Sequence, residues 1–377
     1  MTAFSGSFST VDLDDTEALL AADRDGALWA ASMAGAQVRA TAAAVDEGAL
    51  DAVRSESRDY PPRAVIWLAT RGTAATAGSL LAATHGDSVR APLVLAAEAP
   101  SWIGSLDVVV IAGDDPGDPA LVAAAAAGVR RGARVVVVAP YEGPLRDATA
   151  GRVAVLEPRI AVAAEFGLPR YLAAGLAIMD ALELGGAGAP SDLGALADEL
   201  DAEALRNSAA RELFTNPAKL LADRIVGRAV ALAGDCAATL ALARHGSAAM
   251  LRIGQTTVAA TGLADAVSAL RARSAGGNDD ADIFHDEQID GPALDRLRVL
   301  ALTLAAERTV VAARINGLGD VDLVAAGDVP VAPGASAETA NPTQGPPPSG
   351  PGRAEQQLAV LAVRLEMAAA YVRLLRG

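Results

Sequence analysis

The stretch IAGDDPGDPALV, residues 111–122, decides the fold class and raises the question of function. An apolar run, residues 106–110, precedes it, and an alanine-rich segment and a second apolar run, ARVVVVAP at 133–140, follow it. A strand that turns directly into a helix is how phosphate-binding loops are built, because free backbone N–H groups at a helix N-terminus bind anions. This turn instead carries Asp114, Asp115 and Asp118. The function of this loop therefore depends on the role of its three carboxylates.

Outward from this stretch, short apolar runs alternate with helical patterns along the chain. The runs lie at residues 63–69, 93–98, 106–113, 133–140 and 152–158, and the pattern resumes at 227–234. Strands that alternate with helices at these lengths predict right-handed crossovers and parallel sheets. The predicted fold class is α/β, with two halves of parallel sheet flanked by helices.

The composition of the segments predicts five parts. Residues 332–352 are rich in Pro, Gly and Ser and read as a linker, and the helix after them carries an apolar face that we expect to dock on its own body or on a partner subunit. The predicted parts are an N-terminal helical segment at 1–60, a first α/β half at 61–190, a second half at 191–331, the linker at 332–352 and a C-terminal helix at 353–377.

Charge and composition exclude several classes of function. The net charge of −15 argues against a nucleic-acid or anionic-membrane surface, although a locally basic pocket for a small anion is compatible with it. A single cysteine, Cys236, excludes an intramolecular disulfide and is interpreted as a packed thiol. No apolar run reaches the roughly 18 residues that a membrane span needs. We expect a cytoplasmic protein.

Four strings, in this order, resemble the bifunctional phosphoglucose/phosphomannose isomerases of the sugar isomerase (SIS) fold. They are ATRGTAATAG at 69–78, FGLPRYLAAGLAIM at 166–179, TNPAKLLADRIVGRAVALAG at 215–234 and FHDEQIDG at 284–291. Among those isomerases the chain looks most similar to the actinobacterial TobH-like branch. The resemblance implies two SIS-like halves, a sugar phosphate as ligand, no cofactor and a homodimer.

The resemblance also implies roles for individual residues. Gly72 and Thr73 match the first phosphate loop, and Arg170 matches the arginine that steadies the enediolate. His285 matches the histidine that opens the sugar ring. Lys219, the only lysine in the chain, lies in the family's Asn-Pro-Ala-Lys helix and is placed among the substrate-binding residues.

Two positions depart from the family pattern. The second phosphate loop, rich in Ser and Thr in the family, is the acidic turn with Asp114, Asp115 and Asp118, whose carboxylates would repel a phosphate. The family's general base is a glutamate, and Gln255 stands at that position. A general base contributes about 10² to 10⁴ in rate. Isomerisation would therefore need another carboxylate, with Glu287 the first candidate.

Each of these signals has an alternative interpretation. The three aspartates suit either a divalent metal or a solvated acidic turn. Gly72 and Thr73 could form only a turn with a threonine cap, and Arg170 and Lys219 could be ordinary exposed residues. Two functions follow: an aldose–ketose isomerase acting on glucose 6-phosphate or mannose 6-phosphate, or a non-catalytic sugar-phosphate sensor or partner of sugar-phosphate enzymes.

Overall fold

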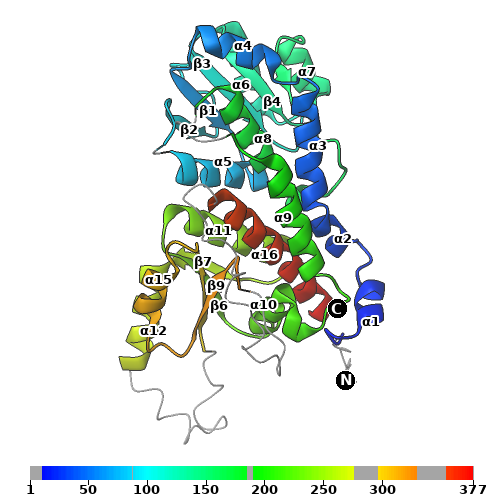
Figure 1. The fold of residues 1–377 in the computed structure, drawn as a ribbon, viewed down its shortest axis with the longest axis vertical. Helices are drawn as coiled ribbons and strands as arrows, with labels where there is room; N and C mark the ends of the chain where they lie inside the picture. Colours follow the sequence, from blue (N-terminus) through cyan, green and yellow to red (C-terminus); the bar gives the residue numbers. More distant parts are fainter. Residues whose placement is uncertain (1–10, 87, 185–189, 276–295, 329–353, 377) are drawn as a thin grey trace, which may run out of the picture. The chain divides into compact units, whose positions relative to one another are not determined.

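The computed structural model describes residues 11–86, 88–184, 190–275, 296–328 and 354–376. These residues form two compact units (Figure 1). The first unit consists of residues 29–204, and the second combines residues 1–28 with residues 205–377. The N-terminal segment is therefore shared between the units, and the chain crosses between them at residues 28 and 204 rather than at the boundaries expected near 60 and 190.

A five-stranded parallel sheet forms the centre of the first unit. Its strand order is β2-β1-β3-β4-β5, and every neighbouring pair runs parallel. The central strands β1 and β3 are buried along their whole length, which explains their continuous apolar sequence. The strands are β1 (Ala64–Leu68), β2 (Leu93–Ala96), β3 (Asp107–Ala112), β4 (Arg134–Val138) and β5 (Ala154–Val155).

Helices cover both faces of this sheet (Figure 1). Leu121 of α6 and Leu145 of α7 pack with the β-strand residues of one face. On the other face, Trp67 of β1 lies between α5 and α8: a Cβ atom at Gly78 would come within 2.3 Å of its ring and one at Gly175 within 3.2 Å. Helices α2 to α9 are α2 (Ala27–Ser32), α3 (Ala34–Asp46), α4 (Asp51–Asp59), α5 (Gly72–His85), α6 (Pro119–Arg130), α7 (Gly143–Thr149), α8 (Leu168–Ala181) and α9 (Leu193–Arg206), with a 3-10 turn η1 (Ala164–Phe166) before α8.

The second unit has a four-stranded parallel sheet of its own, in the order β7-β6-β8-β9. The prediction of an α/β fold with two halves, each a parallel sheet flanked by helices, is thus confirmed. The strands are β6 (Val230–Gly234), β7 (Ala259–Gly262), β8 (Arg298–Thr303) and β9 (Val321–Ala325). The helical elements are α1 (Thr16–Ala22), η2 (Leu213–Thr215), α10 (Pro217–Ile225), α11 (Ala237–Arg252), α12 (Leu263–Ala275), α15 (Arg308–Ile315) and α16 (Ala354–Arg376).

The C-terminal helix α16 belongs to the core of the second unit of its own chain. It packs against α10 and α11, and its residues from 358 to 372 are all buried. The charged residues of this stretch are buried as well: Arg364 donates to the carbonyl oxygens of Ala325 and Ala326, both at 2.9 Å. Glu366 pairs with His245 of α11 at 2.9 Å. The homodimer that we expected this helix to support stays a prediction.

No described helix is both long and apolar enough to cross a bilayer.

Shortening a buried side chain at the centre of α16 should destabilise the fold. Leu361 has no exposed surface, so Leu361→Ala leaves a cavity and should lower the free energy of unfolding by about 2–5 kcal/mol. Leu251→Ala on α11 is the matched control, because that side chain is 61% exposed. Urea unfolding followed by circular dichroism measures both. Equal losses in the two variants would contradict the burial of α16.

Candidate functional site

The candidate site lies where the strand order of the first sheet reverses. β1 connects to β2 on one side and β3 connects to β4 on the other, so the chain diverges beyond the carboxyl ends of β1 and β3. Ligands of open α/β sheets bind at such switch points. The turn after β1 holds Thr70 and Arg71 and leads into α5 at Gly72, and the turn after β3 holds residues 114–118. The strand register brings these two turns together, since Leu68 pairs with Ile111.

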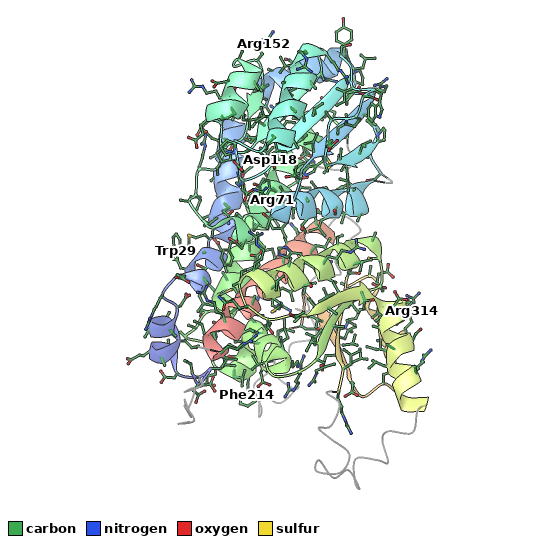
Figure 2. All side chains as sticks on the ribbon, turned by 180° about the vertical axis from the view of Figure 1, so that it is seen from behind. Trp29, Arg71, Asp118, Arg152, Phe214 and Arg314 are labelled. Carbon is green, nitrogen blue, oxygen red and sulfur yellow. The ribbon has the colours of Figure 1, made fainter. Side chains whose placement is uncertain are left out.

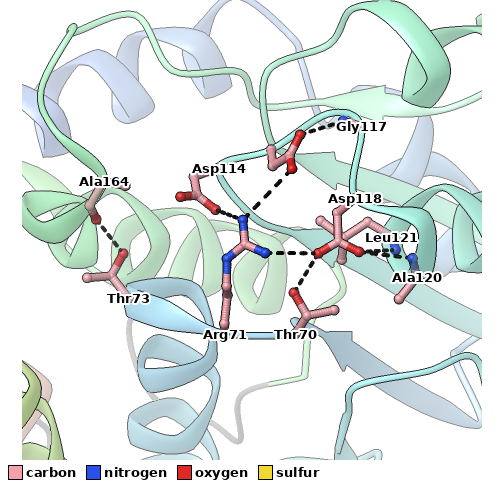
Figure 3. A network of polar contacts seen from close by, with 10 residues as sticks. Thr70, Arg71, Thr73, Asp114, Gly117, Asp118, Ala120, Leu121 and Ala164 are labelled. Atoms are coloured by element: carbon pink, nitrogen blue, oxygen red, sulfur yellow. Dashed lines mark hydrogen bonds and ion pairs between the residues drawn. The ribbon is translucent and has the colours of Figure 1, made fainter.

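Asp118 is the N-cap of α6. Its carboxylate accepts the backbone N–H of Ala120 at 2.9 Å and that of Leu121 at 3.4 Å, and the hydroxyl of Thr70 donates to it at 2.8 Å (Figure 3). The residue is 7% exposed. The N–H groups that would bind a phosphate in a loop of this shape are therefore already bound by a carboxylate of the same chain.

Arg71 lies among the three carboxylates of the acidic turn. Its guanidinium nitrogens are 3.7 Å from Asp114, 3.9 Å from Asp115 and 3.7 Å from Asp118 (Figure 3). Its side chain is 60% exposed, so solvent screens these ion pairs and each one contributes little to stability. Among the described residues, no group of three His, Cys, Asp or Glu side chains is arranged to hold a metal ion. The acidic turn is thus partly neutralised by an arginine from the facing turn.

The environment of Asp118 favours its charged form. Burial acts to raise the pKa of this carboxyl, but the hydrogen bonds from Thr70, Ala120 and Leu121 and the charge of Arg71 outweigh burial and lower the pKa below its ordinary value. A carboxyl whose pKa is lower in the folded state stabilises the fold when it is ionised. That stabilisation is lost as the pH falls through its folded-state pKa.

The N-terminus of α5 differs from that of α6. Gly72, its first residue, has φ +67°, a conformation that favours glycine, and no side chain caps this helix. Thr73 is 7% exposed and donates its hydroxyl to the carbonyl oxygen of Ala164 at 3.0 Å, which ties α5 to η1. Gly72 and Thr73 therefore leave the first turn of α5 without a carboxylate.

Arg170 and Tyr171 lie in the first turn of α8 and carry buried polar atoms. The guanidinium carbon of Arg170 lies 4.2 Å from the centre of the Tyr171 ring. Nη1 of Arg170 and the hydroxyl oxygen of Tyr171 are buried, and beyond the interaction of these two side chains with each other neither atom has a hydrogen-bond partner among the described residues. A buried polar group without a partner costs about 1–3 kcal/mol. Such a pair marks a place where a polar ligand would be stabilising.

Both side chains of this pair have perturbed acidity. Burial lowers the pKa of Arg170, while Tyr171 and Asp114 favour its charge. Burial also raises the pKa of Tyr171 to about 12, so its hydroxyl stays protonated and able to donate at neutral pH. The effect of Asp114 on both groups indicates that the start of α8 and the acidic turn share one electrostatic environment. Neither Arg71 nor Tyr171 was predicted from the sequence as a site residue, although Arg71 directly precedes the predicted site residue Gly72.

Lys219 lies in the second unit and has a structural role. Its side chain has no exposed surface, and its ammonium group donates to the carbonyl oxygens of Leu13, Ala209 and Arg211 at 2.5, 2.9 and 2.6 Å. An ammonium group has three N–H donors, so none is left for a substrate. Burial lowers its pKa, against the charges of Asp14 and Asp12. Lys219 is neither an exposed helix residue nor part of the site proposed below.

The remaining predicted catalytic residues are Gln255, His285 and Glu287. Gln255 is in the second unit, in the turn after α11, with an exposed side chain, φ +48° and a carbonyl oxygen that accepts a hydrogen bond from Arg376 at 2.9 Å. His285 and Glu287 lie outside the described residues. The structure therefore gathers Gly72, Thr73, the three aspartates and Arg170 in one unit and does not test the catalytic assignments.

Solved structures share the fold of this chain, whereas no known protein family and no curated protein sequence matches it. A protein from Silicibacter pomeroyi, provisionally assigned as a phosphosugar isomerase, is similar with a TM-score of 0.60 and 16% identity, over 92% of this chain and 96% of that one. The C-terminal domain of glucosamine-fructose-6-phosphate aminotransferase from Francisella tularensis is similar with a TM-score of 0.57 and 11% identity, over 94% and 98%. Tagatose-6-phosphate ketose/aldose isomerase from Escherichia coli gives 0.55 and 12%, over 89% and 90%.

These likenesses establish a fold of the phosphosugar-isomerase type. The SIS-like architecture predicted from the four sequence strings is confirmed by them. The narrower resemblance to the phosphoglucose/phosphomannose branch is not among the similarities found.

Replacement of Asp118 should destabilise the first unit in a pH-dependent way. At neutral pH, Asp118→Ala removes the α6 cap and should lower the free energy of unfolding by about 1 kcal/mol. The difference should shrink as the pH falls below the ordinary aspartate pKa of about 3.9 and through the lower folded-state pKa of Asp118, because wild-type Asp118 then becomes protonated.

Asp115→Ala in the same turn is the control, since that carboxylate is 51% exposed and should change stability by less than about 0.5 kcal/mol. Urea titrations at a series of pH values measure both variants. An Asp118→Ala loss that stays constant down to acidic pH would show that the charge of Asp118 contributes nothing.

Proposed function

We propose that this chain binds a sugar phosphate at the switch point of the first unit, with Arg170 and the N-terminus of α5 as the anion-binding groups. The observation that carries the proposal is that Nη1 of Arg170 and the neighbouring hydroxyl of Tyr171 are buried and, beyond their interaction with each other, lack a hydrogen-bond partner among the described residues. Two donors that lack acceptors fit an oxygen-rich ligand. The uncapped first turn of α5, opened by Gly72, adds backbone N–H groups.

The acidic turn limits how that ligand can bind. The carboxylate of Asp118 holds the N-terminus of α6, and Asp114 and Asp115 add two negative charges beside it. A phosphate at α6 would have to displace a carboxylate that is also negatively charged and has no translational entropy to lose. The sugar phosphate therefore binds with its anionic group directed to α5 and Arg170. The acidic turn faces the hydroxyl groups of the sugar, which donate hydrogen bonds to its carboxylates.

We expect this chain to have little or no isomerase activity. Gln255 takes the position of the family's catalytic glutamate, and a neutral amide does not remove a proton from carbon. If the chain is active, it acts as an aldose–ketose isomerase of the glucose-6-phosphate and mannose-6-phosphate type, with His285 opening the ring, Arg170 steadying the enediolate and Glu287 as base. The alternative is a cytoplasmic, homodimeric sensor of sugar phosphates or a partner of sugar-phosphate enzymes.

Removal of Arg170 should weaken sugar-phosphate binding. Arg170→Gln deletes a charged donor and should raise the Kd for fructose 6-phosphate about tenfold to a hundredfold, the range expected for a hydrogen bond to a charged group. Arg152→Gln is the control, because Arg152 is exposed and lies away from Arg71 and Asp118 in the same unit (Figure 2).

Isothermal titration calorimetry at fixed ionic strength measures the three proteins. Unchanged affinity in Arg170→Gln, with the fold intact by circular dichroism, would place the ligand elsewhere. An equal loss in Arg152→Gln would reduce the effect to general electrostatics.

A carboxylate at position 255 should test the catalytic assignment. If Gln255 occupies the base position, the wild type should exchange the C1 or C2 hydrogen of hexose 6-phosphates with solvent deuterium very slowly. Gln255→Glu should then accelerate that exchange by at most about 10² to 10⁴. Nuclear magnetic resonance follows the exchange, and Gln255→Asn is the matched control. Rapid exchange by the wild type would contradict the non-catalytic proposal and make Glu287 the next residue to replace.

A further inference from the structure

A small pocket of the first unit lies between α5 and β2, the strand at one edge of the sheet (Figure 1). Four alanines line it together with Trp67, Ser79 and Leu95. Its volume is about 210 Å³, below the range of roughly 300–1,000 Å³ that takes a whole small molecule. The pocket therefore fits one substituent of a ligand rather than the entire ligand.

The lining of this pocket carries no charged side chain, and its side-chain donors are already used. The indole N–H of Trp67 donates to the carbonyl oxygen of Ala74 at 2.9 Å, and the hydroxyl of Ser79 donates to that of Ala75 at 3.0 Å. The Ser79 oxygen keeps a lone pair with which it can accept a hydrogen bond. The pocket suits an uncharged, mainly apolar group that brings a donor of its own.

The pocket also leaves apolar surface in contact with water. Leu95 is 46% exposed, whereas the other three residues of β2 are partly buried. One exposed leucine alone needs no explanation, but this one borders a hollow whose lining is apolar throughout except for Ser79 and the indole nitrogen. A substituent that covers Leu95 removes this surface from water, which favours binding.

The first turn of α5 is common to the pocket and to the proposed sugar-phosphate site. Ala75 lines the pocket and lies three residues after Gly72, a rise of about 4.5 Å along the helix. Thr73 of the same turn reaches the start of α8: a Cβ atom at Gly167 would lie 3.3 Å from both the Thr73 hydroxyl oxygen and the Tyr171 ring. A ligand held by the N–H groups of this turn is therefore within reach of both places.

We propose that the ligand of the first unit is a sugar phosphate with a short acylamino group, whose acyl part occupies this pocket. The inference rests on the proposed function, because it takes the phosphate to bind at Arg170 and the first turn of α5. An acetamido group matches the lining: it is uncharged, its methyl group contacts alanines and Leu95, and its N–H donates to the Ser79 oxygen. A free ammonium group would find no counter-charge among the lining side chains.

The experiment uses the full-length protein with N-acetylglucosamine 6-phosphate, glucosamine 6-phosphate and glucose 6-phosphate as probes. In isothermal titration calorimetry, the Kd of the acetyl compound should be about tenfold lower than that of glucose 6-phosphate, the factor expected for one buried methyl group and one hydrogen bond. Glucosamine 6-phosphate should show no such gain. In saturation-transfer nuclear magnetic resonance, the acetyl methyl protons should receive the strongest signal of the ligand.

Variants at Ser79 locate the acetyl group. Ser79→Leu fills the pocket and should raise the Kd of the acetyl compound to that of glucose 6-phosphate, whose own Kd should not change. Ser79→Ala keeps the space, removes the acceptor and should lose part of the preference; it serves if circular dichroism shows Ser79→Leu to be unfolded. Thr84→Leu is the matched control, because Thr84 also lies on α5, bonds a carbonyl oxygen one turn earlier and does not line the pocket. Arg170→Gln should weaken all three ligands by a similar factor.

Three results would overturn this inference and leave the proposed function in place. The first is equal affinity for the acetyl compound and glucose 6-phosphate, with both weakened by Arg170→Gln. The second is a preference for the acetyl compound that survives in Ser79→Leu, which would place the acetyl group elsewhere. The third is tightest binding of glucosamine 6-phosphate, which would show that the acidic turn recognises an ammonium group. Binding of none of the three would refute the proposed function and this inference with it.

Discussion

The carboxylate of Asp118 at the N-terminus of α6 is the interaction on which the site of this protein depends. It satisfies the N–H groups of Ala120 and Leu121, fixes the hydroxyl of Thr70 from the neighbouring turn and attracts Arg71. The three carboxylates that looked out of place in a phosphate-shaped loop thus have partners within the protein. A helix N-terminus requires a negative or polar group, but a ligand need not supply it.

The sequence predicted the fold well because the sheet residues are buried on both faces. Runs such as residues 107–112 and 134–138 must be continuously apolar when helices cover both sides, so they are easy to recognise. The site was predicted only in part. Arg71 was missed because its partners, Asp114 and Asp115, are over 40 residues away, and only the pairing of β1 with β3 brings the two turns together.

Buried charges explain where the sequence prediction was wrong. Lys219 was placed among the substrate-binding residues or on an exposed face, and Arg364 and Glu366 were not singled out, because charged side chains are seldom fully buried. Each one is buried with a partner from a distant segment: backbone carbonyls after β9, His245 of α11, and carbonyls of residues 13, 209 and 211. No periodicity in the sequence reports such pairings. They link α16, α10 and the N-terminal segment into the second unit.

In the first unit, the hydrogen bonding of the polar groups distinguishes the start of α6 from the start of α8 as places for a ligand. At α6, the carboxylate of Asp118 is bound on every side by groups of the chain itself, so a ligand gains little there. At α8, Nη1 of Arg170 and the hydroxyl of Tyr171 are buried and, beyond their interaction with each other, have no hydrogen-bond partner among the described residues, which costs about 1–3 kcal/mol. A fold retains such a cost only where something offsets it, and apolar residues of similar size would avoid it. A ligand that accepts hydrogen bonds offsets it, which is why the proposed binding site is placed at Arg170 and not at the loop that first drew attention.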